Sequence, residues 1–293
     1  MAEAHDAAEQ SATPRKRYGP SMSSRWRSAA TLAVLLLTSC ASTRTIPADT
    51  QTLLAAALTP DSNVATVVVG PGGATVSYQE AGGLRVVSLS PTAAPSIAAD
   101  RQLPSRPGDS FDARLIVETA KNLATTCKYN SQSTVATALS VSATAIETTC
   151  GASISSTVNG HPLTVLSRGW ALDNLKVLWS DLSVVVPDAK VTLIMLEEDY
   201  VVFGFVSAMT ACPQVWWVRN FNGTTSAHCR SAFTGDLVDT TRFSPQRMLD
   251  AVSTAGASLP SASPQSVYVI AHPDSLKVTL ARGDEQRLIE VVP

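Results

Sequence analysis

The chain has 293 residues, and its 22 Lys and Arg against 24 Asp and Glu give a formal net charge of −2. This length suits one to three small domains, and non-specific nucleic-acid binding is not expected because it needs a basic surface. The longest apolar stretch after the N-terminal region, residues 190–209, is interrupted by Glu197, Glu198 and Asp199, so we expect it not to cross a bilayer.

The first element is an apolar run from Ala29 to Leu37, preceded by Arg25 and Arg27. Its length of nine residues is too short for a membrane-spanning helix, which needs about 20, but typical of a signal peptide with a basic start. The run ends in Leu37-Thr38-Ser39-Cys40, which resembles the lipobox of bacterial lipoproteins. The alternative is an ordinary secretory signal that happens to contain a cysteine, and Met22 is a second candidate start.

The lipobox resemblance implies that residues 1–39 are a signal peptide, removed before Cys40, and that the Cys40 thiol carries lipid. The chain is then bound to a membrane through the lipid on Cys40 and lies on its extracytoplasmic face. In a bacterium with two membranes, the outer membrane can be the one that holds the anchor. Removing residues 1–39 takes away five basic and three acidic side chains, which leaves a net charge of −4. Residues 40–49 are expected to be a lipidated polar tether.

The following residues, 50–90, are predicted to form a small αβ unit. It has a short helix over residues 50–58 and strands around turns at Pro71-Gly72-Gly73 and Gly82-Gly83. Residues 91–109 contain four prolines and are predicted to be a Pro-rich linker.

Residues 110–241 are predicted to form an αβ core that contains four cysteines. Its first helix covers residues 111–124, with Asp109 or Ser110 as the N-cap, and a second helix covers 171–182. The remaining elements are one long strand over 133–150, a hairpin turning at Asn159-Gly160, two buried strands over 190–196 and 200–209, and a second hairpin turning at Asn222-Gly223. A C-terminal αβ unit over 244–293 has a helix capped by Ser244 with Pro245 in its first turn, followed by three strands.

Several landmarks recur about 60 residues apart. The two Asn-Gly turns are 63 residues apart, and Cys150 and Cys212 are 62 apart. We therefore expect an α+β fold built from tandem units of about 60 residues, each a helix followed by an antiparallel sheet. The alternative is that short αβ segments of similar length look alike by chance.

Cys127, Cys150, Cys212 and Cys229 are expected to form two disulfides that staple the core, because an even number of cysteines in an exported chain is typical of such bonds. Their gaps of 23, 62 and 17 residues do not match zinc-ligand spacing, so we expect no metal and no cofactor. Pairing Cys127–Cys150 and Cys212–Cys229 is favoured because each closes a short loop. The rival pairing, Cys150–Cys212 with Cys127–Cys229, remains open.

Catalytic motifs are weak in this sequence. Gly108-Asp109-Ser110 resembles the nucleophile block of the GDSL hydrolases, but it follows no apolar strand, and the later Asp-x-x-His of that family is missing. His161, His228 and His272 lie in no recognisable triad pattern. We therefore expect no catalytic residue.

A possible ligand contact is the aromatic stretch that contains Trp216, Trp217, Arg219 and Phe221. In a regular strand, Trp216 and Trp217 point to opposite faces, so one is expected in the core. The other, with Arg219 or Phe221, can offer a platform for a sugar, peptide or lipid.

The sequence thus predicts a lipid-anchored extracytoplasmic protein of the bacterial cell envelope with a non-enzymatic binding or scaffold role. Its expected partner is an envelope protein or a cell-wall ligand, and not nucleic acid. The alternative is an envelope enzyme that acts on cell-wall material through an unrecognised active site.

Overall fold

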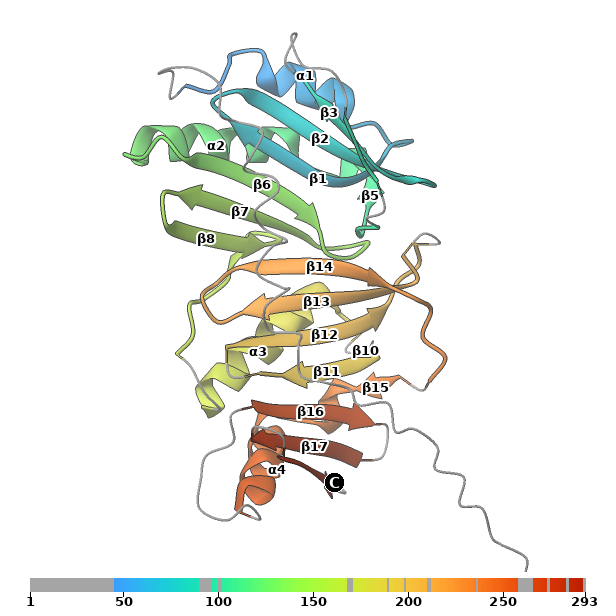
Figure 1. Cartoon of the computed structure of the whole chain (residues 1–293). Coiled ribbons are helices and arrows are strands. Elements are labelled where there is room, and N and C mark those ends of the chain that lie inside the picture. The colour runs from blue at the N-terminus through green and yellow to red at the C-terminus, as the bar shows by residue number, and fades with distance from the viewer. Residues whose placement is uncertain are drawn as a thin grey trace, which may run out of the picture. The chain divides into compact units, whose positions relative to one another are not determined.

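The structure is a computed structural model of the chain, shown in Figure 1. Cys40 and the predicted signal peptide lie outside the described residues. The structure describes residues 45–89, 96–99, 102–167, 171–188, 190–197, 199–209, 212–235, 237–257, 266–272, 275–282 and 285–291.

The first sheet has nine strands in the described part of the chain, and all its pairs are antiparallel. Their order is β4-β3-β2-β1-β6-β7-β8-β9, with β5 also paired to β1. The strands are β1 Asn63–Gly70, β2 Gly73–Glu80, β3 Gly83–Ser88, β4 Ser96–Ala99, β5 Arg106–Pro107, β6 Gln132–Ala138, β7 Thr144–Cys150, β8 Ser153–Val158 and β9 His161–Pro162.

Helices α1 (Thr50–Ala57) and α2 (Ala113–Thr126) cover one face of this sheet. Leu54 of α1 and Ile116 of α2 pack in one buried cluster with Val67 and Val76 of the strands. Ile46 is buried in the same cluster, so the expected tether over 40–49 ends earlier than predicted.

The second sheet has the order β11-β12-β13-β14 and is covered on one face by helix α3 (Leu172–Val185). Its strands are β11 Leu193–Leu196, β12 Tyr200–Val206, β13 Gln214–Asn220 and β14 Thr225–Arg230, and beside it β10 (Lys190–Val191) pairs with β15 (Val238–Asp239). The third sheet follows helix α4 (Pro245–Ala257) and consists of β16 Ser266–His272, β17 Ser275–Arg282 and β18 Glu285–Val291. Strand β16 lies alongside β11 (Figure 1), and two 3₁₀ helices cover Gly108–Ser110 and Thr240–Arg242.

The fold is therefore α+β, as predicted, with four α-helices and mainly antiparallel sheets in the described residues. The sheets do not follow the expected domain boundaries. Strands β1 and β6 are direct neighbours, so residues 50–90 and the first part of 110–241 share one sheet. Residues 91–109, expected to be a linker, contain strands β4 and β5.

The long strand predicted over 133–150 is wrong, because the chain turns back between β6 and β7. In that turn, the Leu139 N–H donates to the Ala143 carbonyl at 2.8 Å, and the Ser140 hydroxyl accepts from the Ser142 N–H at 3.3 Å. Leu139 and Ala143 are both fully buried, so the turn is held by its own hydrogen bonds and by the core.

The two predicted Asn-Gly turns differ in length. Asn159 and Gly160 both have positive φ, 48° and 83°, and directly connect β8 and β9, as expected for a two-residue hairpin turn. The second turn is longer, because the last pair of β13 and β14 is Arg219 with Thr225.

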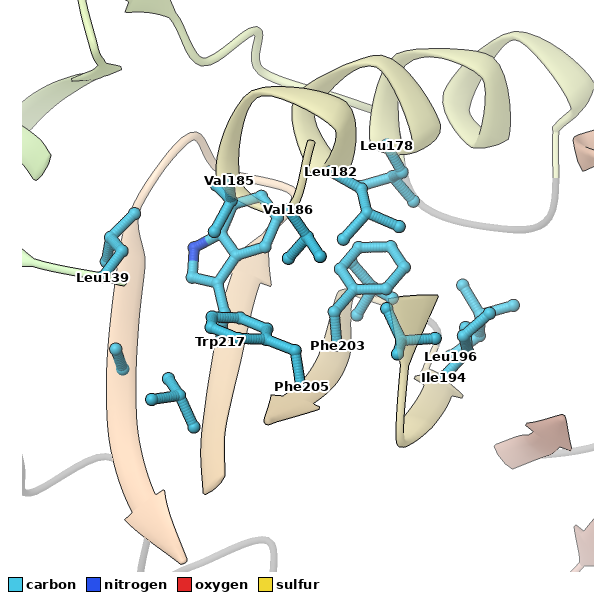
Figure 2. Close-up of a cluster of buried hydrophobic side chains, with 14 of the residues drawn as sticks. Leu139, Leu178, Leu182, Val185, Val186, Ile194, Leu196, Phe203, Phe205 and Trp217 are labelled. Atoms are coloured by element: carbon cyan, nitrogen blue, oxygen red, sulfur yellow. The ribbon is translucent and has the colours of Figure 1, made fainter. Parts of the chain in front are cut away.

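Among the described residues, the core beneath α3 is the larger of two hydrophobic clusters. Figure 2 shows Leu178, Leu182 and Val185 of α3 facing Phe203 and Trp217 of the sheet. The Phe203 and Trp217 rings stack with centroids 5.7 Å apart, an arrangement that adds about 0.5–1.5 kcal/mol to the burial of their area. The cluster also includes Leu139, Ala143, Ala145 and Val158 from the first sheet and its turn.

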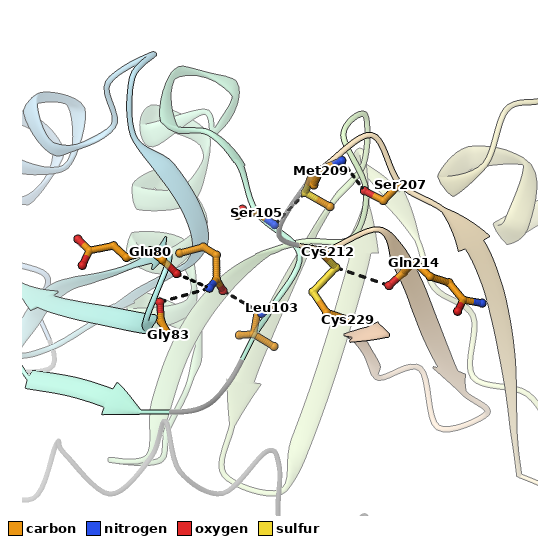
Figure 3. The surroundings of a disulfide bond; sticks show 10 residues. Glu80, Gly83, Leu103, Ser105, Ser207, Met209, Cys212, Gln214 and Cys229 are labelled. Carbon is orange, nitrogen blue, oxygen red and sulfur yellow. Dashed lines mark hydrogen bonds between the residues drawn. A yellow bond between two sulfur atoms is a disulfide. The ribbon is translucent and has the colours of Figure 1, made fainter. Parts of the chain in front are cut away.

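Both favoured disulfides are present. Cys127 and Cys150 are joined with a Cα–Cα distance of 5.6 Å, and Cys212 and Cys229 with one of 5.0 Å. Cys229 lies opposite Val215, three residues from Cys212. Just before β13 the Cys212 N–H donates to the Met209 carbonyl at 3.0 Å, and the disulfide joins Cys212 to Cys229 of β14 (Figure 3).

The N-cap of α2 is Asp112, and the expectation of Asp109 or Ser110 was wrong. The Asp112 carboxylate accepts from the Leu115 N–H at 2.9 Å, whereas the Ser110 hydroxyl donates to the Pro107 carbonyl. The expected Ser244 cap of α4 is present, since its hydroxyl accepts from the Arg247 N–H at 3.3 Å.

We predict that Asp112→Ala lowers the free energy of unfolding by about 1 kcal/mol, the usual effect of losing an N-cap side chain. Urea denaturation measures this. Asp112→Asn keeps a capping oxygen and is expected to stay close to the wild type. An equal loss in Ser110→Ala would contradict the assignment of the cap to Asp112.

Candidate functional site

Strand β13 separates the predicted aromatic residues onto two faces. Trp217 and Arg219 are fully buried on the α3 face and Phe221, just after the strand, is 3 % exposed, whereas Trp216 is half-buried on the opposite face. The two tryptophans therefore do point to opposite faces. Of the four residues expected to contact a ligand, the structure places only Trp216 at the surface and the other three inside the core.

Trp216 is held in place from several sides. Its partner on the neighbouring strand β12 is Gly204. A Cβ atom added to Gly204 would lie 3.3 Å from the Trp216 Cδ1 atom and 2.6 Å from the Thr192 hydroxyl. The small residue thus leaves room for the indole to lie close to the strand. On the ring lies the guanidinium of Arg230, 4.2 Å from the ring centroid, a cation–π contact of about 0.5–1 kcal/mol at exposed sites.

The Gln214 side chain positions the indole further. Its amide lies 2.6 Å from the Thr192 hydroxyl, 3.2 Å from Trp216 Nε1 and 3.1 Å from the Ser231 carbonyl. All three contacts are satisfied when the amide oxygen faces Thr192 and Trp216 and the amide nitrogen donates to Ser231. Trp216 is therefore a preorganised side chain in a hydrogen-bond network.

The same face of the sheet carries polar side chains from β14. His228 lies directly opposite Trp216, and its Nε2 atom is 3.3 Å from the Ser226 hydroxyl. This distance is longer than the 2.6–3.2 Å typical of an activated nucleophile and its base. We call the group Trp216, His228 and Arg230 the Trp216 surface, and its chemistry suits binding through an aromatic ring, an imidazole and a cation.

Arg219 makes structural contacts inside the protein. Its Nε atom donates to the Asp181 carboxylate of α3 at 3.0 Å, and its other nitrogens donate to the Asn220 and Thr164 carbonyls. The exposed fractions of the two charged side chains are 0 % and 12 %. Burial raises the pKa of Asp181, while Arg219 and then His161 lower it, so the guanidinium compensates a carboxylate that is out of water.

Glu147 of β7 is a second carboxylate that is partly removed from water. Burial raises its pKa, and hydrogen bonds from the Ser156 hydroxyl, at 3.3 Å, and the Thr225 backbone partly oppose this. Thr225 begins β14, so Glu147 connects the first and second sheets.

Two further properties concern the described residues alone. None of their helices is both long enough and apolar enough to span a bilayer, and no three of their His, Cys, Asp or Glu side chains gather where a metal ion could bind.

Sequence reasoning missed Arg230 and Gln214 as neighbours of Trp216. A usable signal was present for Arg230. Cys229 must point toward its disulfide partner, so the strand period of two places both His228 and Arg230 on the other face. Gln214 likewise lies two residues before Trp216 on the same strand.

Comparison with known proteins gives little. No family model matches the chain, and no curated protein matches it. Similar solved structures include the PCNA of Thermococcus kodakaraensis and Proliferating Cellular Nuclear Antigen from Entamoeba histolytica. Each is 9 % identical with a TM-score of 0.19, covering 83 % of this chain and 94 % or 93 % of the other. Likeness at this TM-score supports no conclusion about fold or function.

We predict that Glu147→Gln stabilises the protein at neutral pH. The pKa of Glu147 in the folded protein is raised above the usual 4.5, so the folded state favours the protonated carboxyl. The contribution of this carboxyl to the free energy of unfolding is therefore lost as pH rises from about 4.5 through the folded-state pKa. Glutamine stays neutral and can still accept from Thr225.

Chemical denaturation of both proteins between pH 4 and pH 8 measures the effect. The stability advantage of Glu147→Gln is expected to grow with pH and then to level off. Parallel curves for the two proteins would show that the carboxyl pKa is not raised.

Proposed function

We propose that the protein is a lipid-anchored, extracytoplasmic protein of the bacterial cell envelope with a non-enzymatic binding or scaffold role. The observation that carries this proposal is the Leu37-Thr38-Ser39-Cys40 sequence directly after a short apolar run. A cysteine at this place provides the thiol for a lipid, and two or more acyl chains make an anchor stable.

The two disulfides support the extracytoplasmic location. Cys127 and Cys150 are 23 residues apart, and Cys212 and Cys229 are 17 apart. Disulfides of this kind persist in oxidising compartments outside the cytoplasm. By the chain-entropy model, loops of this size contribute about 3 kcal/mol each. A chain with these disulfides is suited to the envelope.

The Trp216 surface supports the binding role. It combines a fixed indole, an imidazole and a guanidinium, all partly exposed, on the sheet face opposite α3. Tryptophan and arginine are the residue types most enriched among energetically important interface residues. We assign the contact with an envelope protein or cell-wall ligand to this surface.

We further propose that the fold arose from tandem units of about 60 residues. In the described chain, a helix followed by antiparallel strands occurs four times, beginning at α1, α2, α3 and α4. Superposition of the α2 and α3 units, strand by strand, tests this proposal.

We predict that Cys40→Ala abolishes lipid attachment, since no other residue in the lipobox can supply a thiol. Metabolic labelling with a clickable fatty acid, followed by membrane fractionation, measures this. The wild type is expected to be labelled and membrane-bound, and the variant unlabelled and either soluble or uncleaved.

A double variant, Cys127→Ser with Cys150→Ser, is the matched control because it removes two cysteines and keeps Cys40. It is expected to keep the label. A labelled Cys40→Ala protein, or an unlabelled wild type, would refute the anchor.

We predict that Arg230→Gln weakens partner binding several-fold, as expected for an interface residue worth more than about 1 kcal/mol. Affinity purification from crosslinked cells, with quantification of each recovered component, measures this. Arg114→Gln on α2, whose side chain is 74 % exposed, is the control. Equal recovery in both variants would remove the Trp216 surface from the binding role.

A further inference from the structure

The connection between Cys40 and the folded protein is very short. Ile46 is the first buried side chain among the described residues and packs in the core under α1 and α2. Only residues 41–45 lie between it and Cys40. Even a fully extended chain spans at most about 3.3–3.6 Å per residue, so the Cys40 and Ile46 Cα atoms are at most about 22 Å apart.

Helix α1 begins four residues after Ile46 and is about 12 Å long at 1.5 Å per residue. Among the described helices, it is the one nearest to Cys40 along the chain. Its inner side, with Leu54, is buried in the core. Its outer side consists of Thr52, Leu53, Ala55 and Ala56, all exposed.

The outer side of α1 is unusual because it carries no charge. Between Asp49 and Asp61 the chain has no charged residue, and Leu53 is 38 % exposed. A helix on the protein surface normally presents charged and polar residues to water. The neighbouring helix α2 does so, with Arg114, Glu118 and Lys121 on its exposed side.

We propose that the outer side of α1, formed by Thr52, Leu53, Ala55 and Ala56, rests in the headgroup layer of the bilayer that holds Cys40. The inference rests on the proposed lipid anchor and adds an orientation to it. The alanines allow close approach of the helix, and Leu53 reaches into the acyl boundary. The strength with which a helix binds the membrane interface scales with the apolar area that it buries there.

This contact fixes which way the protein faces. Helices α1 and α2 cover one face of the first sheet, so the opposite face of that sheet points away from the lipid. A tether of five residues is long enough for contact between α1 and the membrane and too short to place the domain far from it.

A fluorescent label on Ala56→Cys tests the contact in the intact, lipidated protein. The four structural cysteines are in disulfides and Cys40 carries lipid in the proposal, so the introduced thiol is the one that reacts. The protein is reconstituted in phosphatidylcholine–phosphatidylglycerol vesicles containing headgroup-depth quencher lipids. We expect the label at position 56 to be quenched about twofold or more, and a label on Val206→Cys of β12, 53 % exposed, to keep its emission.

The second arm introduces Leu53→Asp together with the label at position 56. A helix that rests on lipid is expected to lose most of the quenching, because a charge at position 53 disfavours the contact. Val206→Asp on β12, where the valine is 53 % exposed, is the matched control and is expected to leave the quenching at position 56 unchanged.

The outcomes separate the two proposals. Quenching that is absent at position 56, or that Leu53→Asp does not reduce, in protein that co-sediments with vesicles overturns the α1 contact and leaves the lipid anchor in place. Protein that carries no lipid and does not co-sediment overturns both.

Discussion

The buried guanidinium of Arg219 is the contact on which the second half of the structure depends. It joins three separate parts of the chain: Asp181 of α3, the carbonyl of Thr164 before that helix, and Asn220 at the end of β13. Breaking such a pair by removing one partner leaves an uncompensated charge and costs about 3–5 kcal/mol. The position of α3 over its sheet is therefore set by charge as well as by apolar packing.

Strand β13 carries core residues on one face and Trp216 of the Trp216 surface on the other. Residues Trp217 and Arg219 point inward, so Trp216 must point outward, and the Cys212–Cys229 disulfide enforces the matching alternation on β14. His228 and Arg230 are consequently presented beside Trp216. A change of register by one residue would bury the Trp216 surface and expose Trp217 and Arg219, so the core and the candidate binding surface are specified together.

Local signals in the sequence predicted many elements correctly. The apolar spacing of α2 and α3, the Asn159-Gly160 turn, the Ser244 cap and both disulfide pairings all depend on contacts between residues close in the chain. The turn at 139–143 could not be predicted in this way. Leu139, Val141 and Ala143 continue the period of two across it, and no Gly or Pro interrupts the pattern.

Contacts distant in sequence were missed for a related reason. Arg219 and Asp181 are 38 residues apart, and Glu147 meets Thr225 from another sheet. Nothing near either carboxylate in the chain distinguishes it from a solvated one. The strands within 91–109 were hidden by prolines, which are tolerated at the edges of sheets.

In the proposed lipid-anchored protein, the place where the chain enters the fold also determines the response to mechanical load. In an anchored chain, a pull between the membrane and a bound partner enters at Ile46 and reaches α1 before any strand. Helix α1 is held by side-chain packing and by the Tyr78 hydroxyl, which donates to the Ala57 carbonyl, whereas β1 is hydrogen-bonded along its length to β2, β5 and β6. Under load, helix α1 is therefore expected to detach and unfold first, and the nine-stranded sheet is expected to stay folded.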